Sequence, residues 1–162
     1  NKFESAFMVD VEIKILAGAG VDDFVGLLKT FEVVFEMENL HIPDQHYLLN
    51  LLRKPEFMCL VAKCEGQVIG GLTVHILPNY YNAKPVAFAY DLGIQKEFQR
   101  KGIGKKLIGR LVEYCKENEF DHAFVEAETE DQYAVDFYRS TPVTSELNAV
   151  HFTYRFEEVV GG

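Results

Sequence analysis

Apolar and polar residues alternate near the start of the chain and then recur at helical spacing. The run at 8–16 alternates as a strand does. Apolar residues three and four positions apart then predict a helix that extends to about Met37, with Asp22 or Asp23 as its N-cap. Residues 44–54 form a second, shorter helical run. This part of the chain predicts one strand followed by two helices.

The rest of the chain alternates between extended and helical segments. Further strands are predicted at residues 56–64, 67–77, 86–94, 122–129 and 149–158. Two more helices are predicted, at residues 103–117 and 131–140. Glu65 and Gly66 form a favourable hairpin turn between the first two of these strands. The order predicts an α/β fold around a central sheet.

The chain length is that of one domain with a sizeable core. It has 162 residues, 48% of them apolar and 25% charged, so we expect a single globular domain over residues 1–162. No apolar run is long enough to span a membrane, and charges interrupt the beginning of the chain, unlike a signal peptide. We therefore expect a cytoplasmic protein. Residues 1–7 precede Met8 and are expected to be disordered or vector-derived.

The cysteines and histidines do not follow a metal-binding pattern. Cys59, Cys64 and Cys115 lack CxxC spacing, and Cys59 and Cys64 are expected on opposite faces of one strand. Reduced thiols fit a cytoplasmic protein. The five histidines form no known ligand motif, so no metal is expected.

The charges are unevenly distributed. The net charge of −9 disfavours nucleic acid as the main ligand and favours a cationic partner. Residues 96–110 nevertheless hold six cations against one acid, whereas residues 113–136 hold nine acids against one lysine. This separation suggests two ligands of opposite charge; solvated helix faces and loops are the alternative interpretation.

The segment QRKGIGKK, residues 99–106, has the composition of a phosphate site. Its two glycines allow close backbone approach, and a helix N-terminus follows. A Walker A loop is excluded because Lys106 stands where Ser or Thr is required. A dinucleotide fingerprint is disfavoured because Leu107 stands where a third small residue is expected.

Several segments together carry a family resemblance. DLGIQKEFQRKGIGKKLI resembles the acetyl-CoA pyrophosphate signature Q/R-x-x-G-x-G/A of the GNAT acyltransferases. With HYLLNLLRKPEFMCLVA, GGLTVHILPNY and DQYAVDFYRS, it resembles the aminoglycoside 3-N-acetyltransferases over roughly residues 24–157. The resemblance implies the GNAT fold, in which about four helices flank a mixed, mostly antiparallel sheet.

The same resemblance implies acetyl-CoA as the cofactor. Backbone N–H groups from Arg100 to Gly104 would bind its pyrophosphate, and main-chain groups of Leu92 and Ile94 would pair with its pantetheine arm. The implied cofactor-binding residues are Leu92, Gly93, Ile94, Gln99, Arg100, Lys101, Gly102, Ile103, Gly104 and Lys105.

Two residues are implied for the proton transfers. Strict alternation along residues 86–94 predicts one face with Phe88, Tyr90, Leu92 and Ile94, and another with Ala87, Ala89, Asp91 and Gly93. By resemblance, Asp91 binds or deprotonates the acceptor amine, and Tyr138 protonates the departing thiolate. The alternatives are that Asp91 caps a turn and that Tyr138 packs its helix.

Acidic and aromatic residues are candidates for the acceptor side. Glu126 and Glu128, two apart on strand 122–129, can attract a polycation or relay a proton, or simply form a solvent-exposed face. GNAT acceptor sites are lined from positions that correspond here to Glu36, Glu38, Asp44, Tyr80, Tyr81 and Asn82. Pro142 departs from the family, which has glycine there, and this alters the turn that follows the last helix.

These observations predict acetyl transfer to a primary amine of a cationic small molecule, with the 3-amino group of an aminoglycoside as the leading acceptor. Direct attack is expected because no cysteine is placed as a nucleophile. Polyamine or peptide acetylation and a non-catalytic acyl-CoA sensor are the alternatives. Neither nucleic acid nor membrane is an expected partner. A homodimer is expected, with the aromatic C-terminal strand as a candidate interface.

Overall fold

The structure, a computed structural model, describes residues 10–157. The expectation for residues 1–7 lies outside this range, as do the outer ends of the predicted strands 8–16 and 149–158. The chain forms two compact units, one extending to Glu126 and the other beginning at Ala127. Each unit is described by itself below. No helix within residues 10–157 is both long enough and apolar enough to cross a membrane.

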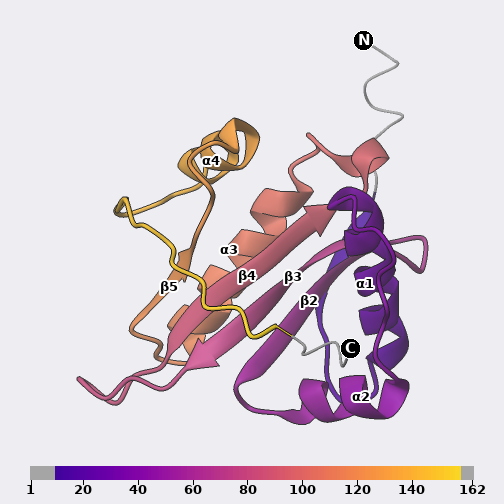
Figure 1. Cartoon of the computed structure of the whole chain (residues 1–162), viewed down its shortest axis with the longest axis horizontal. Helices are drawn as coiled ribbons and strands as arrows, with labels where there is room; N and C mark the ends of the chain where they lie inside the picture. The colour runs from indigo at the N-terminus through magenta and orange to yellow at the C-terminus, as the bar shows by residue number, and fades with distance from the viewer. Residues whose placement is uncertain (1–9, 158–162) are drawn as a thin grey trace. The chain divides into compact units, whose positions relative to one another are not determined.

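The first unit is built on a mixed sheet. Its strands are β1 (Val11–Ile15), β2 (Phe57–Cys64), β3 (Gln67–Leu77), β4 (Val86–Ile94) and β5 (His122–Val125), in that order across the sheet. Neighbouring strands are antiparallel except β4 and β5, which are parallel (Figure 1). Glu65 and Gly66 turn the β2–β3 hairpin with φ values of 50° and 78°, as their predicted role requires. The predicted fold class is confirmed.

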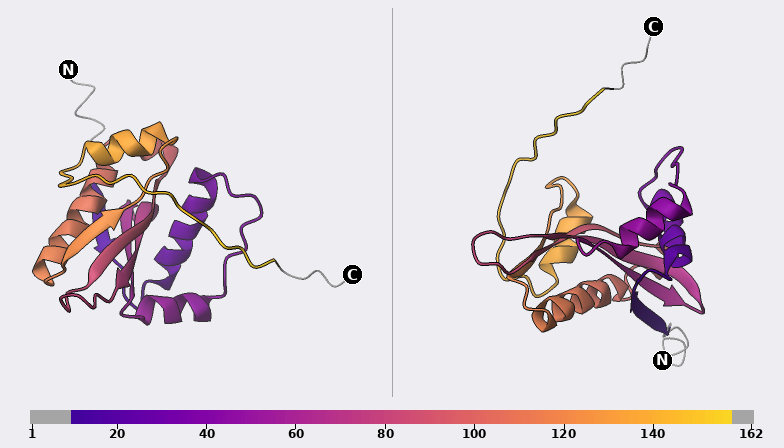
Figure 2. Two further views of the ribbon diagram at one scale, coloured as in Figure 1. Left: turned by 60° about the vertical axis from the view of Figure 1, so that its left-hand side comes forward. Right: turned by 90° about the horizontal axis from the view of Figure 1, so that it is seen from below.

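Helices cover both faces of this sheet. The helices of the first unit are α1 (Val21–Val34), α2 (Gln45–Arg53) and α3 (Ile103–Glu117), and a short 3-10 turn, η2 (Lys96–Phe98), precedes α3. α1 and α2 lie on one face and α3 on the other (Figure 2). The fully buried Leu72 and Leu107 belong to the core beneath α3, whereas Leu27 and Val61 belong to the core beneath α1 and α2.

The two N-terminal helices begin in different ways. The prediction that Asp22 or Asp23 caps α1 is wrong, because Gly20 is the N-cap and both acids lie in the first helical turn. There the negative charges interact favourably with the positive end of the helix dipole. The carboxylate of Asp23 also lies 3.1 Å from the ammonium of Lys63 on β2. Asp44 caps α2 by accepting a 2.9 Å hydrogen bond from the backbone N–H of Tyr47.

β4 contains an irregularity that strict alternation does not predict. Thr73 of β3 pairs with Asp91, but the next β3 residue, Val74, pairs with Ala89. Tyr90 therefore has no partner in the register, which is the pattern of a β-bulge. One extra residue in a strand exchanges the faces of all residues that follow it.

The bulge overturns the predicted faces of β4. Leu92 and Ile94 pack into the core beneath α3, the same core that holds Ala87 and Ala89 before the bulge. A Cβ on Gly93 would lie 2.9 Å from the ring of Phe31 in α1, so this residue faces the opposite side. By alternation, Asp91 shares the α1 side with Gly93. The assignment of Leu92 and Ile94 to the face opposite Ala87 and Ala89 is therefore wrong.

The second unit contains α4 (Gln132–Arg139) and an extended segment. Asp131 caps α4 by accepting a 3.1 Å bond from the N–H of Ala134, and Arg139 forms an ion pair with Glu146 beyond the helix. The closing strand predicted at 149–158 is wrong over its described part, because residues 149–157 adopt no strand. Without a neighbouring strand, alternation alone does not produce sheet structure.

Candidate functional site

β4 has one free edge directly before the predicted phosphate loop. β5 pairs only with Val86–Ala89, so no strand of the described chain pairs with that side of the later half of β4 (Figure 1). The N–H of Asp91 points toward β3, where it donates to Thr73 Oγ1 at 3.2 Å. Main-chain groups of successive strand residues point to opposite edges, so those of Leu92 and Ile94 point to the free edge. An extended ligand can pair with such groups.

The loop between β4 and α3 is held by its own residues. Gln99 Nε2 donates a 2.9 Å hydrogen bond to the carbonyl oxygen of Ile94, which fixes the loop to the end of the strand. Arg100 has a φ of 61°, and Gly102, the N-cap of α3, has a φ of 80°. A Cβ on Gly102 would have no neighbour within 4 Å, so glycine is favoured there by its backbone conformation. The space beside Gly102 is open.

The start of α3 presents backbone donors and cations together. The first helical bond runs from the N–H of Lys106 to the oxygen of Gly102 at 3.1 Å, and Ile103 is buried in the core beneath α3. The N–H groups of the first turn, including those of Ile103, Gly104 and Lys105, have no acceptor within the helix and carry partial positive charge. This donor set fits a diphosphate group.

Three cationic side chains belong to the same loop and first helical turn as these donors. Arg100, Lys101 and Lys105 are all exposed. The ammonium of Lys101 lies 5.6 Å from the centroid of the Phe98 ring, a cation–π distance that holds it beside the loop. All three side chains can form charge-assisted hydrogen bonds with phosphate oxygens. The positive end of the site is therefore on α3 and the loop before it.

Asp91 is the only carboxylate on β4, and it is half-buried. Burial raises the pKa of its carboxyl group above the ordinary value, and the nearby His75 lowers it in part. A raised pKa makes Asp91 a stronger base than an exposed aspartate and so better suited to accepting a proton from an ammonium group.

His75 was not predicted from the sequence. It lies on β3 two residues from Thr73, hence on the same face, and its ring meets that of Tyr90 edge-on at 5.2 Å. The sequence feature that could have indicated its position is the antiparallel pairing of strands 67–77 and 86–94, because this pairing brings His75 near Asp91. Nothing in the local pattern marks this histidine.

Tyr138 belongs to the second unit. It is partly buried on α4, its ring lies 5.0 Å from that of Phe137, and its carbonyl oxygen accepts a 2.6 Å bond from the Thr141 hydroxyl. Its assignment as a general acid stays a prediction. Pro142, which departs from the family pattern, lies just beyond this helix in exposed chain.

The candidate acceptor residues of the first unit are dispersed. Glu36, Glu38 and Asp44 are exposed in the connection between α1 and α2, where Asp44 already serves as a cap. Tyr80 and Tyr81 are 87% and 86% exposed in the β3–β4 loop. That loop precedes Val86, about 17 Å along the strand from Asp91 at ~3.4 Å per residue. The structure does not bring the tyrosine loop together with Asp91.

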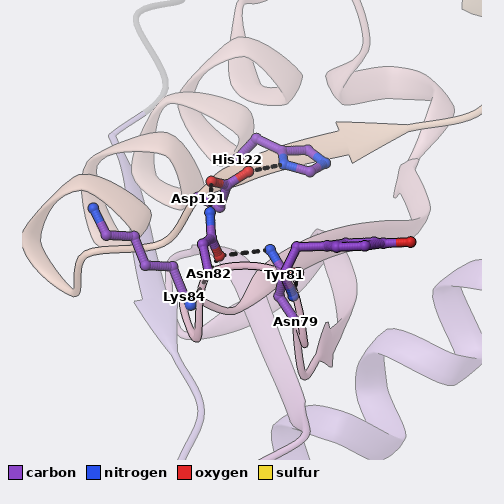
Figure 3. Close-up of polar contacts among 6 residues, drawn as sticks. All are labelled: Asn79, Tyr81, Asn82, Lys84, Asp121 and His122. Atoms are coloured by element: carbon purple, nitrogen blue, oxygen red, sulfur yellow. Dashed lines mark hydrogen bonds and ion pairs between the residues drawn. The ribbon is translucent and has the colours of Figure 1, made fainter.

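A polar network orders the tyrosine loop instead (Figure 3). Asn79 donates to Asn82 at 2.8 Å, Asn82 donates to Asp121 at 2.5 Å, and the Nδ1 of His122 lies 2.7 Å from the same carboxylate. The hydrogen bonds from His122 and Asn82 hold the pKa of Asp121 below its ordinary value. The network ties the loop that carries Tyr81 to the beginning of β5.

The acidic pair after β5 is placed differently from the prediction. β5 ends at Val125, so Glu126 and Glu128 do not share a strand face, and both are exposed. The carbonyl of Glu128 accepts the N–H of Asp131 in the turn before α4. Both β5 and its pairing with β4 end at Val125, so the predicted strand 122–129 is too long.

Cys59 and Cys115 are poor nucleophiles in this environment. Cys59 and Cys115 are buried, and burial raises the pKa of both thiols, that of Cys115 to about 11. Little thiolate is present at neutral pH under these conditions. The described residues 10–157 contain no group of three or more His, Cys, Asp or Glu side chains arranged to hold a metal ion.

Known proteins resemble this chain over most of its length. Residues 24–141 match the acetyltransferase (GNAT) family. The aminoglycoside acetyltransferase meta-AAC0020 from an uncultured soil metagenomic sample, in complex with sisomicin, is 43% identical, covers 91% of this chain and 97% of its own, and has a TM-score of 0.89. The aminoglycoside acetyltransferase HMB0005, from a similar sample, is 29% identical, with coverages of 91% and 99% and a TM-score of 0.83. AAC(6')-Iy in complex with CoA shares the fold at 14% identity, with coverages of 91% and 97% and a TM-score of 0.71. The chain belongs to the GNAT acetyltransferase family.

Proposed function

We propose that this GNAT acetyltransferase transfers an acetyl group from acetyl-CoA to a primary amine of an aminoglycoside, at the 3-amino position. The observation that carries the substrate class is the similarity to meta-AAC0020, an aminoglycoside acetyltransferase that is 44% identical over 91% of this chain. The 3-amino position rests on the resemblance of the segments around Asp91 and α4 to the 3-N-acetyltransferases.

The residues present fit acetyl-CoA. When bound, the cofactor supplies the acetyl group as a thioester. Its diphosphate suits the N–H groups at the start of α3, with Gly102 leaving room beside them and Arg100 supplying charge. The backbone groups of Leu92 and Ile94 at the free edge of β4 suit its amide-containing arm.

The proposed proton transfers use Asp91 and Tyr138. The carboxylate of Asp91 accepts a proton from the substrate ammonium, which leaves a neutral amine able to attack the thioester carbonyl. The phenol of Tyr138 then donates its proton to the sulfur of the departing thiolate. Direct attack, without an acyl-enzyme, is supported by the burial of Cys59 and Cys115, which raises the pKa of both thiols.

The test is CoA thiol release with acetyl-CoA and one amine at a time. The panel is sisomicin, gentamicin, kanamycin, spermidine and a lysine peptide. We expect turnover with the aminoglycosides alone and a product acetylated at the 3-amino group by NMR. Acetylation at another amine would refute the proposed position and keep the substrate class. Turnover with spermidine or the peptide alone would refute the substrate class, and acetyl-CoA binding without turnover would indicate a sensor.

A further inference from the structure

The ring of Phe35, the residue that ends α1, reaches β4 close to Asp91. A Cβ on Gly93 would lie 2.9 Å from the ring of Phe31 and 3.3 Å from the Cζ of Phe35. Gly93 faces the same side of the sheet as Asp91, two residues further along the strand. Phe31 is buried, and its ring centroid lies 5.1 Å from that of Phe35. The buried ring therefore supports the outer one next to the carboxylate.

Tyr90 precedes Asp91 on β4 and contributes a second ring to this face. Its ring meets that of His75 edge-on at 5.2 Å and that of Phe88 at 5.5 Å. His75 and Phe88 pair with each other in the register, on the side of the sheet that Asp91 also faces. The bulge thus places Tyr90 and Asp91 next to each other on one face. Two neighbouring rings hold the ring of Tyr90 there.

Both rings remain partly exposed although each packs against the fold. Phe24, Leu27 and Phe31 form the core-facing stripe of α1 and are buried, whereas Phe35, four residues after Phe31, is 42% exposed. Tyr90 is 57% exposed. The apolar stripe of α1 therefore continues past its cover, and it does so beside the one carboxylate of β4.

We propose that Phe35 and Tyr90 are specificity-determining residues that contact the ring carrying the acceptor amine, with Asp91 between them. The inference rests on the proposed function and names what the site selects: an ammonium group on a saturated six-membered ring, as in an amino sugar or an aminocyclitol. The C–H faces of such a ring pack on aromatic rings, and the ammonium is attracted by their π-faces and by the carboxylate.

The spacing along β4 allows one such ring. Tyr90 and Gly93, where the tip of Phe35 arrives, are three residues apart, or at most about 10 Å at ~3.4 Å per residue. A ring in contact with both aromatic groups needs roughly 7–8 Å, from two contacts of ~3.5–4.0 Å. A linear polyamine presents the charge without the apolar ring faces, and it loses more conformational freedom when it binds.

The first experiment detects the contact with Phe35 directly. The chain contains no tryptophan, so Phe35→Trp introduces a single fluorescent reporter. Without acetyl-CoA, sisomicin should change its emission saturably, and spermidine at equal concentrations should change it far less. Val33→Trp, at a 75% exposed position of the same helix, is the matched control and should show no saturable change. An unresponsive Phe35→Trp, in protein that binds sisomicin by calorimetry, would overturn the contact.

The second experiment removes each ring in turn. Phe35→Leu and Tyr90→Leu should each raise KM for sisomicin about tenfold, because an aromatic contact to the acceptor is lost. KM for acetyl-CoA should stay within about twofold. Phe35→Tyr and Tyr90→Phe keep a ring and should recover most of the loss. Val33→Ala is the control, and thermal melts compare the stability of all variants.

The outcomes separate this inference from the proposed function. A wild-type protein that neither binds nor acetylates sisomicin would refute the aminoglycoside acceptor and this inference with it. Turnover of sisomicin with wild-type KM in both leucine variants would refute the inference alone. Equal rises in KM for sisomicin and acetyl-CoA, with a lowered melting temperature, would show that the rings only support the fold and would also overturn it.

Discussion

At the scale of single residues, the environment of Asp91 is unfavourable for an ionised carboxylate. Burial raises the pKa of its carboxyl group above the ordinary 3.8, so the native state binds this proton more tightly than the unfolded state does. The resulting stabilisation is complete below the unfolded pKa and is lost as the pH rises through the raised native pKa. At a pH above the native pKa, the fold therefore holds an ionised, partly desolvated carboxylate at a cost in stability.

Replacing Asp91 with Asn should separate activity from stability. We expect Asp91→Asn to lower kcat/KM for the amine by about 10²-fold or more, because the proton acceptor is lost. The melting temperature near pH 7 should rise, because the amide is never ionised. Rate–pH profiles and thermal melts measure the two effects. Glu97→Gln, an exposed change on η2, is the control. An unchanged kcat and KM at every pH would remove Asp91 from the mechanism.

Gly102 allows the charge at the phosphate site to be tested without changing shape. Asn and Asp have similar size and both tolerate the left-handed φ of 80° found there. We expect acetyl-CoA to bind Gly102→Asp about tenfold or more weakly than Gly102→Asn, because the added carboxylate repels the diphosphate. Calorimetry with acetyl-CoA measures the difference. Equal affinities of the two variants would show that the diphosphate lies elsewhere.

At the scale of elements, Gly71 is one of the β3 glycines that allow close packing of the sheet. A Cβ on Gly71 would lie 2.5 Å from the carbonyl oxygen of Leu60 and 2.6 Å from a methyl group of Leu27. Gly71→Ala should therefore lower the free energy of unfolding by about 1–3 kcal/mol. Gly26→Ala, inside α1 with its nearest neighbour at 3.4 Å, should raise it by ~0.5–1 kcal/mol. Urea denaturation measures the free energy of unfolding of both variants. Equal changes in Gly71→Ala and Gly26→Ala would contradict this account of the packing.

Asp44 starts α2 and is also a candidate substrate contact. Asp44→Ala should cost about 1 kcal/mol of stability because the helix loses its cap, whereas Asp44→Asn retains a capping oxygen and should cost little. If the carboxylate also attracts the amine, Asp44→Asn should raise KM several-fold without changing the melting temperature. Steady-state kinetics on Asp44→Asn measure this KM. A KM equal to that of the wild type would show that Asp44 only caps the helix.

At the scale of the whole molecule, the net charge of −9 should attract the proposed cationic substrate. The Debye length falls from ~30 Å at 0.01 M salt to ~10 Å at 0.1 M. Over this range KM for a polycationic aminoglycoside should rise several-fold while kcat stays constant. A monoamine acceptor is the control and should respond less. An identical salt response for both acceptors would show that the overall charge does not act on binding.

The accuracy of the predictions depended on how local each feature is. The Glu65–Gly66 hairpin and the helix after Gly102 were predicted correctly, because turn and helix patterns depend on residues that are close together in the sequence. The N-cap of α1 was assigned to Asp22 or Asp23 although the helix starts after Gly20. Helix boundaries are the least certain feature of such predictions, because several adjacent residues can serve as caps.

The sequence by itself determined the order of elements as far as α4, the fold class and the glycine-containing loop before α3. All three follow from periodicity and from glycine positions within a few residues of one another. Only the tertiary structure decided which face Asp91 occupies, that His75 lies near it, and that Leu92 and Ile94 border a free edge. These features depend on the register between strands, which the bulge at Tyr90 shifts by one residue and which no local pattern encodes.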